Sequence, residues 1–369
     1  MDKHLHIISF NVPYPADYGG VIDVFYRIKA LSKAGVKIHL HCFQYGREVA
    51  PVLNDFCEEV IYYKRSMSAL NQFSAKPFIV KSRANRQLLQ RLQKDEYPIL
   101  FEGLHTCNFL GHPKLAGRKK IVRCHNIEHD YYNSLAAKTP WLFRQYFRLE
   151  ASKLKRFEEL YHQADFLAAI SASDYNYFEA KYGKTILMPP CHPNERVNSK
   201  EGRGSFILYH GNLSVQENDE AAKFVVEKIA PFVDFPFVIA GKNPSKALVE
   251  MATKCANVEI LRNPDDEKLD QLVIDAHINL LPTFQATGFK LKLLNALYNG
   301  RFCVGTPQLT EGTGLGELCV LAASEEEMIV AIKRLLSDSF SAEMVEKRRS
   351  ALEGKFSNRS IISKLIDIL

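Results

Sequence analysis

Short apolar segments alternate with amphipathic segments along most of the chain, and this alternation limits the possible folds more than any other feature. Each apolar segment has the length of a strand, and helical spacing of apolar residues fills most of the intervals. The strands expected are 4–10, 36–43, 59–63, 98–102, 120–124, 166–171 and 185–188 in the first half, and 206–210, 237–240, 258–261, 278–281, 302–305 and 319–321 in the second. Strands that alternate with helices pair in parallel under helices on both faces, so the pattern predicts the α/β class.

A linker divides this pattern into two halves. Residues 189–204 are rich in proline, glycine and charge, and the chain of 369 residues is long enough for two domains. The sequence therefore predicts an N-terminal Rossmann-like domain over 1–190 and a C-terminal one over 205–355, with their parallel sheets facing an interdomain cleft. The final segment, 356–369, carries an apolar stripe at helical spacing and is expected to pack across the joint.

Composition excludes several function classes. No apolar run is long enough to span a bilayer, and the N-terminus lacks a signal-peptide profile, so a cytoplasmic protein is expected. The eight cysteines form no C-x-x-C and no zinc-like spacing, which predicts neither a metal nor a disulfide. In residues 1–195, Lys and Arg outnumber Asp and Glu by 27 to 19. This dispersed bias suits an anionic ligand or a membrane surface, but not nucleic acid.

The segment 278–307 is predicted to form a strand, a loop, a helix and a second strand. Its loop and first helical turn hold Thr287, Gly288, Phe289, Lys290 and Lys292. A helix N-terminus already carries partial positive charge, so lysines there are unfavourable unless an anion lies among them. One interpretation is a phosphate held by backbone amides and lysines, and the other is a solvated helix start that is rich in lysine.

A second glycine-bearing loop, 11–20, follows the first strand and precedes a helix. Gly19 and Gly20 allow the backbone to approach a ligand closely, with the helix amides pointing at it. The loop lacks the G-x-G-x-x-G spacing, so a dinucleotide site is not indicated. An ordinary strand-to-helix turn stays open as the alternative.

Four segments spread over nearly the whole chain carry the motifs of one known family. They are Pro15-x-x-x-Gly19-Gly20, Cys124-His125-Asn126-Ile127-Glu128, Tyr209-His210-Gly211-Asn212-Leu213 continuing to Asn218, and Ala240-Gly241-Lys242-Asn243-Pro244 followed by 287–306. With these motifs the chain resembles the retaining GT-B glycosyltransferases of family 4, also called group 1.

The resemblance implies a GT-B fold of two Rossmann-like domains and a hexosyltransferase that acts in polysaccharide biosynthesis. It implies a UDP- or GDP-linked sugar as donor substrate, no cofactor besides it, and a glycan or a lipid-linked acceptor. Gly211 and Asn212 end the strand that opens the nucleotide domain and are expected at the donor.

The sequence departs from the family pattern in two places. Where the family has two glutamates eight residues apart, this chain has Thr287 and Asn295. Asn295 is expected at the ribose hydroxyls, although without charge assistance. The family often has an Arg and a Lys soon after the strand that opens the nucleotide domain, whereas 213–218 contains no cation. Two alternatives therefore stay open: a nucleotide-sugar-binding subunit with weakened catalysis, and a nucleotide-sugar epimerase on the same fold.

Departure of a nucleotide diphosphate would create negative charge on its β-phosphate, which some group must stabilise. The sequence lacks a D-x-D pair, and the acidic pair 265–266 simply suits a helix start, so cations rather than a metal are expected in this role. Lys242 and Lys292 are the predicted catalytic cations, with the amides of Gly19 and Gly20 as further donors.

His125 follows a strand and is the third predicted catalytic residue, because the matching histidine of the family contacts the transferred sugar. Asn126 and Glu128 are expected on the acceptor side, and His105, which follows another strand, is a further candidate. Arg262 is a candidate for stacking on the base. Ordinary structural roles stay open for three of these residues. His125 would then cap a strand end, Glu128 would be an acid in the first turn of a helix, and Arg262 would be solvated.

The helix expected over 142–161 interleaves basic and aromatic residues. It could rest on an anionic inner membrane, which would suit a lipid-linked acceptor. The alternative is a solvated basic face over a buried aromatic one.

Overall fold

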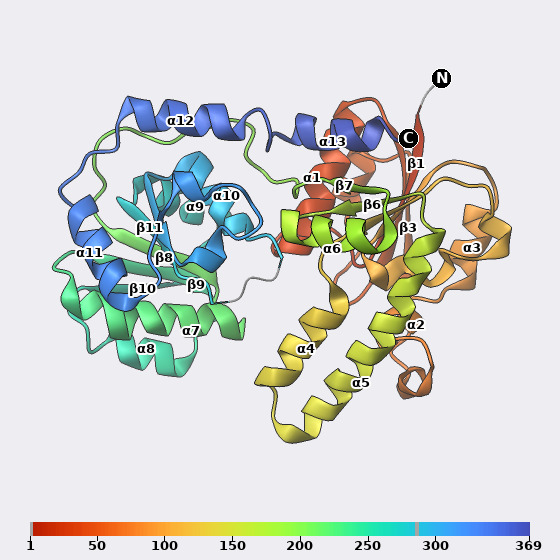
Figure 1. Cartoon of the computed structure of the whole chain (residues 1–369), viewed down its shortest axis with the longest axis horizontal. Helices are drawn as coiled ribbons and strands as arrows, with labels where there is room; N and C mark the ends of the chain where they lie inside the picture. Colours follow the sequence, from red (N-terminus) through yellow and green to blue (C-terminus); the bar gives the residue numbers. More distant parts are fainter. Residues whose placement is uncertain (1–2, 285–287) are drawn as a thin grey trace. The chain divides into compact units, whose positions relative to one another are not determined.

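The computed structural model describes residues 3–284 and 288–369, with the backbone but not the side chain of residue 142. The chain divides into two compact units. The first runs to Pro193 and is completed by Asn358–Leu369, and the second lies between these segments, apart from a few loop residues around Gly288 that group with the first. Each unit has its own parallel sheet, as the alternating pattern predicts (Figure 1).

The sheet of the first unit has seven parallel strands in the order β3-β2-β1-β4-β5-β6-β7. The strands are β1 His4–Ser9, β2 Lys37–Gln44, β3 Glu59–Lys64, β4 Ile99–Glu102, β5 Lys120–Cys124, β6 Phe166–Ala169 and β7 Thr185–Leu187. The chain starts at β1, winds outward through β2 and β3, and then returns to pair β4 with the other side of β1. Doubly wound Rossmann sheets have this order and bind ligands at the carboxyl ends of the strands beside the reversal.

Helices cover both faces of this sheet. The helices of this unit are α1 Gly19–Lys33, α2 Phe78–Lys81, α3 Arg86–Leu92, α4 Glu128–Lys138, α5 Trp141–Glu158, α6 Ala172–Tyr182 and α13 Asn358–Ile366, of which α4 packs mainly against α5. Neighbouring residues of one strand enter different cores, because successive side chains point to opposite faces. Ile7 and Leu100 pack in the core that includes α1 and α13, whereas Ile8 and Phe101 pack in the core that includes α3 and α6.

The second unit repeats this topology with six parallel strands in the order β10-β9-β8-β11-β12-β13. Its strands are β8 Ile207–Asn212, β9 Phe237–Lys242, β10 Val258–Arg262, β11 Ile278–Leu281, β12 Phe302–Gly305 and β13 Val320–Leu321. Its helices are α7 Gln216–Phe224, α8 Lys246–Ala252, α9 Asp266–Asp275, α10 Leu291–Asn299, α11 Glu325–Leu335 and α12 Ala342–Leu352. The order reverses between β8 and β11, so here too the ligand rule points to the carboxyl ends of the central strands.

The predicted strands are confirmed: each lies within two residues of a strand in the described part of the chain. The sequence pattern does not predict α12, because only Arg348 and Leu352 of this helix are buried and its apolar periodicity is weak. The final helix, α13, packs its apolar stripe with α1 inside the first unit. That it also spans the joint stays a prediction, as does the interdomain cleft.

All eight cysteines are free thiols, five of them buried. Among the described residues, no helix combines the length and the apolarity that a membrane span requires.

Candidate functional site

The predicted site residues of the first unit gather where the strand order reverses. β1, β4 and β5 lie side by side. Phe10 and His125 directly follow β1 and β5, and His105 lies three residues beyond the end of β4. The Phe10 ring lies 5.8 Å from the His105 ring and 5.5 Å from the His125 ring, measured between centroids. A Cβ on Gly20 would come within 2.9 Å of Phe10 Cζ, so the glycine loop reaches the same cluster. The structure therefore brings together Gly20, His105 and His125, which are far apart in the sequence.

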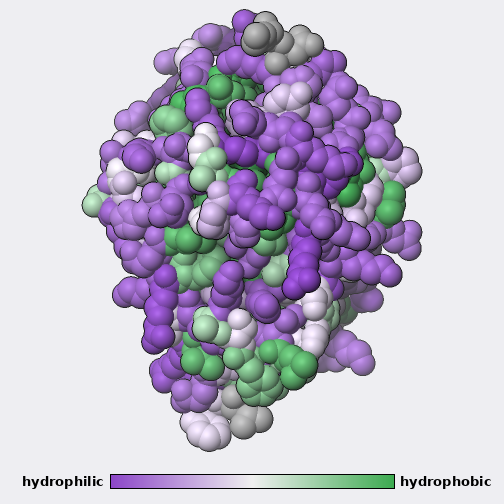
Figure 2. All heavy atoms as spheres, turned by 90° about the vertical axis from the view of Figure 1, so that its right-hand side faces the viewer, coloured by the Kyte–Doolittle hydropathy of each residue, from purple (hydrophilic) through white to green (hydrophobic). Residues whose placement is uncertain are grey.

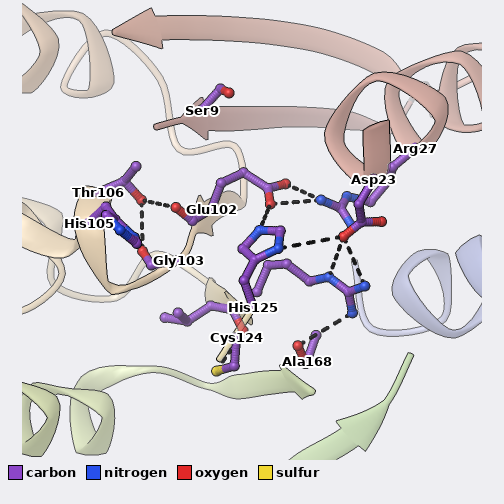
Figure 3. A network of polar contacts seen from close by, with 12 residues as sticks. Ser9, Asp23, Arg27, Glu102, Gly103, His105, Thr106, Cys124, His125 and Ala168 are labelled. Atoms are coloured by element: carbon purple, nitrogen blue, oxygen red, sulfur yellow. Dashed lines mark hydrogen bonds and ion pairs between the residues drawn. The ribbon is translucent and has the colours of Figure 1, made fainter. Parts of the chain in front are cut away.

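A buried charged network surrounds His125, with Glu102 and Asp23 on different sides of the ring (Figure 3). Arg27 donates to Asp23 at 3.0 Å and to Glu102 at 2.6 Å, and Arg123 forms a second ion pair with Asp23 at 2.9 Å. His125 Nε2 lies 3.0 Å from a Glu102 carboxylate oxygen, whereas His125 Nδ1 is 3.9 Å from Asp23, too far for a hydrogen bond. Glu102 thereby fixes the orientation of the ring and leaves Nδ1 as its remaining polar atom.

The network is balanced in charge. Burial alone would raise the pKa of Asp23, but the Arg123 and Arg27 guanidinium groups outweigh burial and hold this pKa below its ordinary value. The pKa of Glu102 is lowered in the same way, because Arg27 and His125 outweigh the effect of burial. Two arginines thus neutralise two carboxylates. Removal of one partner would leave an unpaired buried charge, which is strongly destabilising.

Glu128 differs from these carboxylates because its burial is not offset by a close cation. Burial raises the pKa of Glu128 to about 8, although a hydrogen bond from Asn126 partly opposes the shift. His105 Nδ1 lies 3.8 Å from Glu128 Oε1, and burial holds the pKa of His105 well below its ordinary value. Neither of these two atoms has a hydrogen-bond partner. At neutral pH the pair is thus a protonated carboxyl group beside a neutral imidazole, which suits a hydroxyl-bearing ligand.

In the second unit, Lys292 occupies the first turn of α10, at the carboxyl end of the central strands. Its ammonium donates to Asn218 Oδ1 at 3.3 Å and lies 5.3 Å from the centroid of the Tyr209 ring. Asn218 in turn donates to the backbone carbonyl of Asn212, the last residue of β8, at 3.0 Å. Burial lowers the pKa of Lys292 to about 8, although the nearby Glu217 carboxylate partly opposes the shift. This cation therefore has a neutral amide as its hydrogen-bond partner, and a bound anion would stabilise its charge.

The other predicted cations are arranged differently. Lys290 precedes α10 and pairs with Glu217 at 3.3 Å, so part of its charge is already neutralised. Lys242 is exposed and is the register partner of Asn212, at the ends of β9 and β8. Arg262 is also exposed and pairs in register with Gly241, at the end of β10. All four basic residues thus lie along the carboxyl edge of one sheet.

The other residues predicted to bind the nucleotide-sugar donor make fewer contacts with these basic residues. Asn295 donates to Asp270 Oδ1 of α9 at 3.4 Å and accepts from Asn299 at 2.6 Å. Gly211 lies against Asn218, whose side chain would be 3.2 Å from an added Cβ. Gly288 has a φ of +68°, which favours glycine, and Phe289 is half-buried. Thr287 lies outside the described residues.

The two helices predicted to face phosphate both begin without compensation for their dipoles. Neither α1 nor α10 has a side-chain cap or an acidic residue in its first turn. Of the other helices, α9 and α11 begin with Asp265 and Ser324 as caps and carry acids in their first turns, whereas α5 lacks both, as α1 and α10 do. An uncapped helix start leaves amide donors for an anion. That the amides of Gly19 and Gly20 bind a phosphate stays a prediction.

Sequence reasoning missed the buried charged network around His125. Asp23 and Arg27 are one helical turn apart on the face of α1 that carries its apolar residues, which is a signal that could have found them. It also missed Glu217 and the contact of Lys292 with Tyr209, although Tyr209 lies in a motif that the sequence analysis names. In the described part of the chain, no three His, Cys, Asp or Glu side chains are grouped so that they could hold a metal ion.

Comparison with known proteins places this geometry in context. Residues 204–338 match the family model described as "Glycosyl transferases group 1". An uncharacterised 44.6 kDa protein in the cps region of Klebsiella pneumoniae is 26% identical over 343 residues, which cover 86% of this chain and 87% of that protein. A solved glycosyltransferase from Rickettsia africae is similar with a TM-score of 0.67 at 13% identity, over 100% of this chain and 97% of that one. LpCGTa in complex with UDP has a TM-score of 0.60 at 12% identity, over 100% of this chain and 99% of that one.

At such low identities the structural likeness shows the fold, which is the GT-B fold of two Rossmann-like domains. The predicted fold class is therefore confirmed. The family model over residues 204–338 of the second unit supports a glycosyltransferase.

Proposed function

We propose that this GT-B chain is a retaining glycosyltransferase of the family 4 type, which transfers a sugar from a nucleotide diphosphate donor to a glycan or lipid-linked acceptor. In this proposal the second unit binds the donor, and the first unit carries the acceptor-side residues. The group 1 match over 204–338 supports the donor assignment, because it covers the sheet edge that carries Lys292.

The environment of Lys292 carries the proposal. The Lys292 ammonium lies at an uncapped helix start, and burial keeps its pKa below the ordinary value although the Glu217 carboxylate partly opposes the shift, so a bound anion would stabilise its charge further. A diphosphate fits this position, since the free amides of α10 and the lysine would bind it together. Lys292 would then stabilise the charge that develops as the β-phosphate departs, with Lys242 and Lys290 as further cations along the edge.

The first unit supplies polar groups suited to sugar hydroxyls. His125, held by Glu102, is proposed to contact the transferred sugar through Nδ1. The protonated Glu128 can donate to a hydroxyl and also accept from one, with Asn126 and His105 beside it. These groups are neutral or balanced in charge, which suits an uncharged glycan surface.

The choice of donor and acceptor classes follows from the relatives. The UDP complex of LpCGTa favours a uridine nucleotide as the first donor to test, with GDP sugars next. The relative in the cps region favours an acceptor in polysaccharide assembly. Because cations are proposed to stabilise the leaving group, we expect transfer to continue in the presence of EDTA.

The test is a transfer and donor-hydrolysis assay with UDP- and GDP-sugars, with and without glycan acceptors. Lys292→Ala should lower kcat/KM by about a hundredfold or more, the usual loss when one transition-state donor is removed. The matched control is Lys333→Ala, an exposed lysine of α11, which should retain the wild-type rate. A wild-type rate in Lys292→Ala would overturn the proposal.

Other outcomes separate the alternatives. Nucleotide binding by calorimetry without turnover, in the presence of acceptors, would instead indicate a binding subunit. Conversion of the donor sugar without hydrolysis and without an acceptor would indicate an epimerase.

A further inference from the structure

Two cysteine thiols lie next to each other at the edge of the sheet of the second unit. β13 is the edge strand and pairs in parallel with β12, with Val304 opposite Val320. Cys303 and Cys319 each precede one of these residues, and the extended backbone of Cys319 continues the line of β13. Neighbouring strands are about 4.8 Å apart, and cysteines in a disulfide have Cα atoms about 4.4–6.8 Å apart. The two thiols are therefore within reach of a bond between them.

Both thiols face the same way and border one cavity. Val304 and Val320 pack in the hydrophobic core of the second unit. Successive side chains of a strand point to opposite faces, so Cys303 and Cys319 share the other face. Both cysteines line an open cavity of about 190 Å³. Its other lining residues include five apolar ones, which are Phe302, Leu318, Val320, Phe340 and Met344.

Arg348 of α12 supplies positive charge beside the two thiols and lines the same cavity. Its side chain is 3% exposed and donates to Ser199 Oγ at 3.0 Å and to two backbone carbonyls. These partners are neutral, so they leave the charge of the guanidinium group in place. Burial lowers the pKa of Arg348 to about 10, and the thiols of Cys303 and Cys319 oppose the shift. A cation in this position stabilises the thiolate form of a cysteine.

The two thiols share a proton. A side-chain hydrogen bond with Cys319 lowers the pKa of Cys303, and the Arg348 charge lowers it further. The same bond raises the pKa of Cys319. The pair as a whole therefore gives up its first proton more readily than a single buried thiol, while the second proton stays between the sulfurs.

Five thiols of the first unit are less suited to reaction, because burial raises the pKa of each. They are Cys42, Cys57, Cys107, Cys124 and Cys191. The face of this unit that Figure 2 shows is mainly hydrophilic, whereas Cys303 and Cys319 border a cavity with apolar walls. Both ionisation and access therefore distinguish the pair in the second unit.

We propose that Cys303 and Cys319 form a redox-active dithiol, which small-molecule disulfides oxidise reversibly to a bridge between β12 and β13. The pair first gives one proton to water. The remaining proton moves to Cys303 and leaves the thiolate on Cys319, which is the more exposed of the two. The Cys319 sulfur bonds to one sulfur of the small disulfide, whose S–S bond breaks and releases one thiolate.

Cys303 completes the reaction. It loses its own proton, attacks the Cys319 sulfur and releases the second small thiolate. The two released thiolates take up two protons, so one small disulfide is reduced to two thiols while the protein loses two hydrogen atoms. The dithiol does not depend on the proposed function, because its test measures mass and not sugar transfer.

The test is incubation of the reduced full chain with oxidised glutathione, followed by intact mass measurement and non-reducing peptide mapping. We expect the loss of two hydrogen atoms, a bridge that maps to Cys303 and Cys319, and full reversal by dithiothreitol. Phenylarsine oxide, which bridges two adjacent thiols, should block the reaction when it is added first. These measurements use the wild type, so they do not depend on the folding of a variant.

Single variants separate the roles of the two thiols. Cys303→Ala should stop at a mixed disulfide with one glutathione, because no second thiol displaces it. Cys319→Ala should react about tenfold or more slowly than the wild type, because Cys303 is only 2% exposed. The matched control is Cys255→Ala, at a half-buried cysteine elsewhere in the second unit, which should form the bridge as the wild type does.

Two results would overturn the proposal. One is a wild-type chain that keeps its reduced mass, or that gains glutathione without forming a bridge. The other is a bridge that maps to Cys42 and Cys57 instead, a second pair of thiols that act on each other. That result would mean that proximity alone, without the cavity and Arg348, decides which thiols react.

Discussion

At the residue scale, each unit holds a titratable group whose pKa is moved toward neutrality by burial. Lys292 is a base that is easier to deprotonate than an ordinary lysine, and Glu128 is an acid that keeps its proton at neutral pH. Both shifts arise because the charged form is taken out of water without a full counter-charge. Each shift predicts a pH dependence with a definite sign, of nucleotide binding for Lys292 and of stability for Glu128.

Nucleotide diphosphate binding should weaken as the pH rises through 8. The free protein loses the Lys292 charge near its pKa of about 8, while the phosphates keep theirs. Between pH 8 and 9.5 the association constant should fall roughly tenfold. Titration calorimetry of UDP or GDP measures this. Lys292→Arg should bind with little pH dependence over the same range, because a guanidinium group remains charged. An unchanged affinity of the wild type up to pH 9.5 would contradict the assignment.

Glu128→Gln should stabilise the protein, and more so at high pH. The folded-state pKa of about 8 lies above the ordinary value of 4.5, so the protonated carboxyl favours the folded state. Its contribution is complete below pH 4.5 and is lost as the pH rises toward 8. Glutamine mimics the protonated form at every pH.

Urea unfolding at pH 5 and pH 8.5 checks this prediction. The stability gain of Glu128→Gln over the wild type should be small at pH 5 and on the order of 3 kcal/mol at pH 8.5. Glu267→Gln, at an exposed acid of α9, is the control and should show no such trend. Equal gains at both pH values would mean that Glu128 is ionised in the folded protein.

At the scale of elements, the strand order of each sheet places the candidate sites. The reversals between β1 and β4 and between β8 and β11 bring loops that are distant in sequence to one edge. Glycines allow these loops and strands to approach closely. The closest approach is at Gly241 in β9, where an added Cβ would lie 2.0 Å from the Gly211 carbonyl oxygen of β8.

Gly241→Ala should therefore destabilise the second unit. The new methyl group would push against a backbone atom, which cannot rotate away as a side chain can, and a cost of about 3 kcal/mol is expected. Gly354→Ala is the control, because nothing lies within 4 Å of its added Cβ. The measurement is the urea midpoint of each variant. A Gly241→Ala midpoint equal to that of the control would contradict the described pairing of β8 with β9.

At the scale of the whole molecule, the chain crosses between its units and returns. The last helix, α13, completes the first unit, where Ile361, Ile362 and Leu365 are almost fully buried beside α1. The stability of the N-terminal unit therefore depends on residues at the C-terminus.

Leu365→Ala should loosen the first unit and not the second. A truncated buried leucine costs about 3 kcal/mol. Hydrogen exchange should rise in α1 and β1 but stay unchanged in β8 and β9. Val330→Ala, at an exposed site of α11, is the control and should alter neither unit. Faster exchange confined to the second unit would contradict the placement of α13.

The sequence could predict the strands and part of the site, for one physical reason. Strand ends in a parallel sheet share an edge, so residues that follow strands, such as His105 and His125, meet there. The same logic cannot show which charged residues lie in a core. Asp23, Arg27, Glu102 and Arg123 become partners only after the sheet brings their elements together. The sequence could not predict the exposure of Leu70 and Phe73 in the 3-10 turn Ala69–Phe73 either, because an apolar residue is normally expected to be buried.

The most direct test of the central claim is a crystal structure of the protein with a bound nucleotide diphosphate sugar. The account predicts that the diphosphate lies at the start of α10, within hydrogen-bond distance of Lys292 Nζ and of the first amides of that helix. A diphosphate bound elsewhere in the second unit, with Lys292 still bonded only to Asn218, would contradict it.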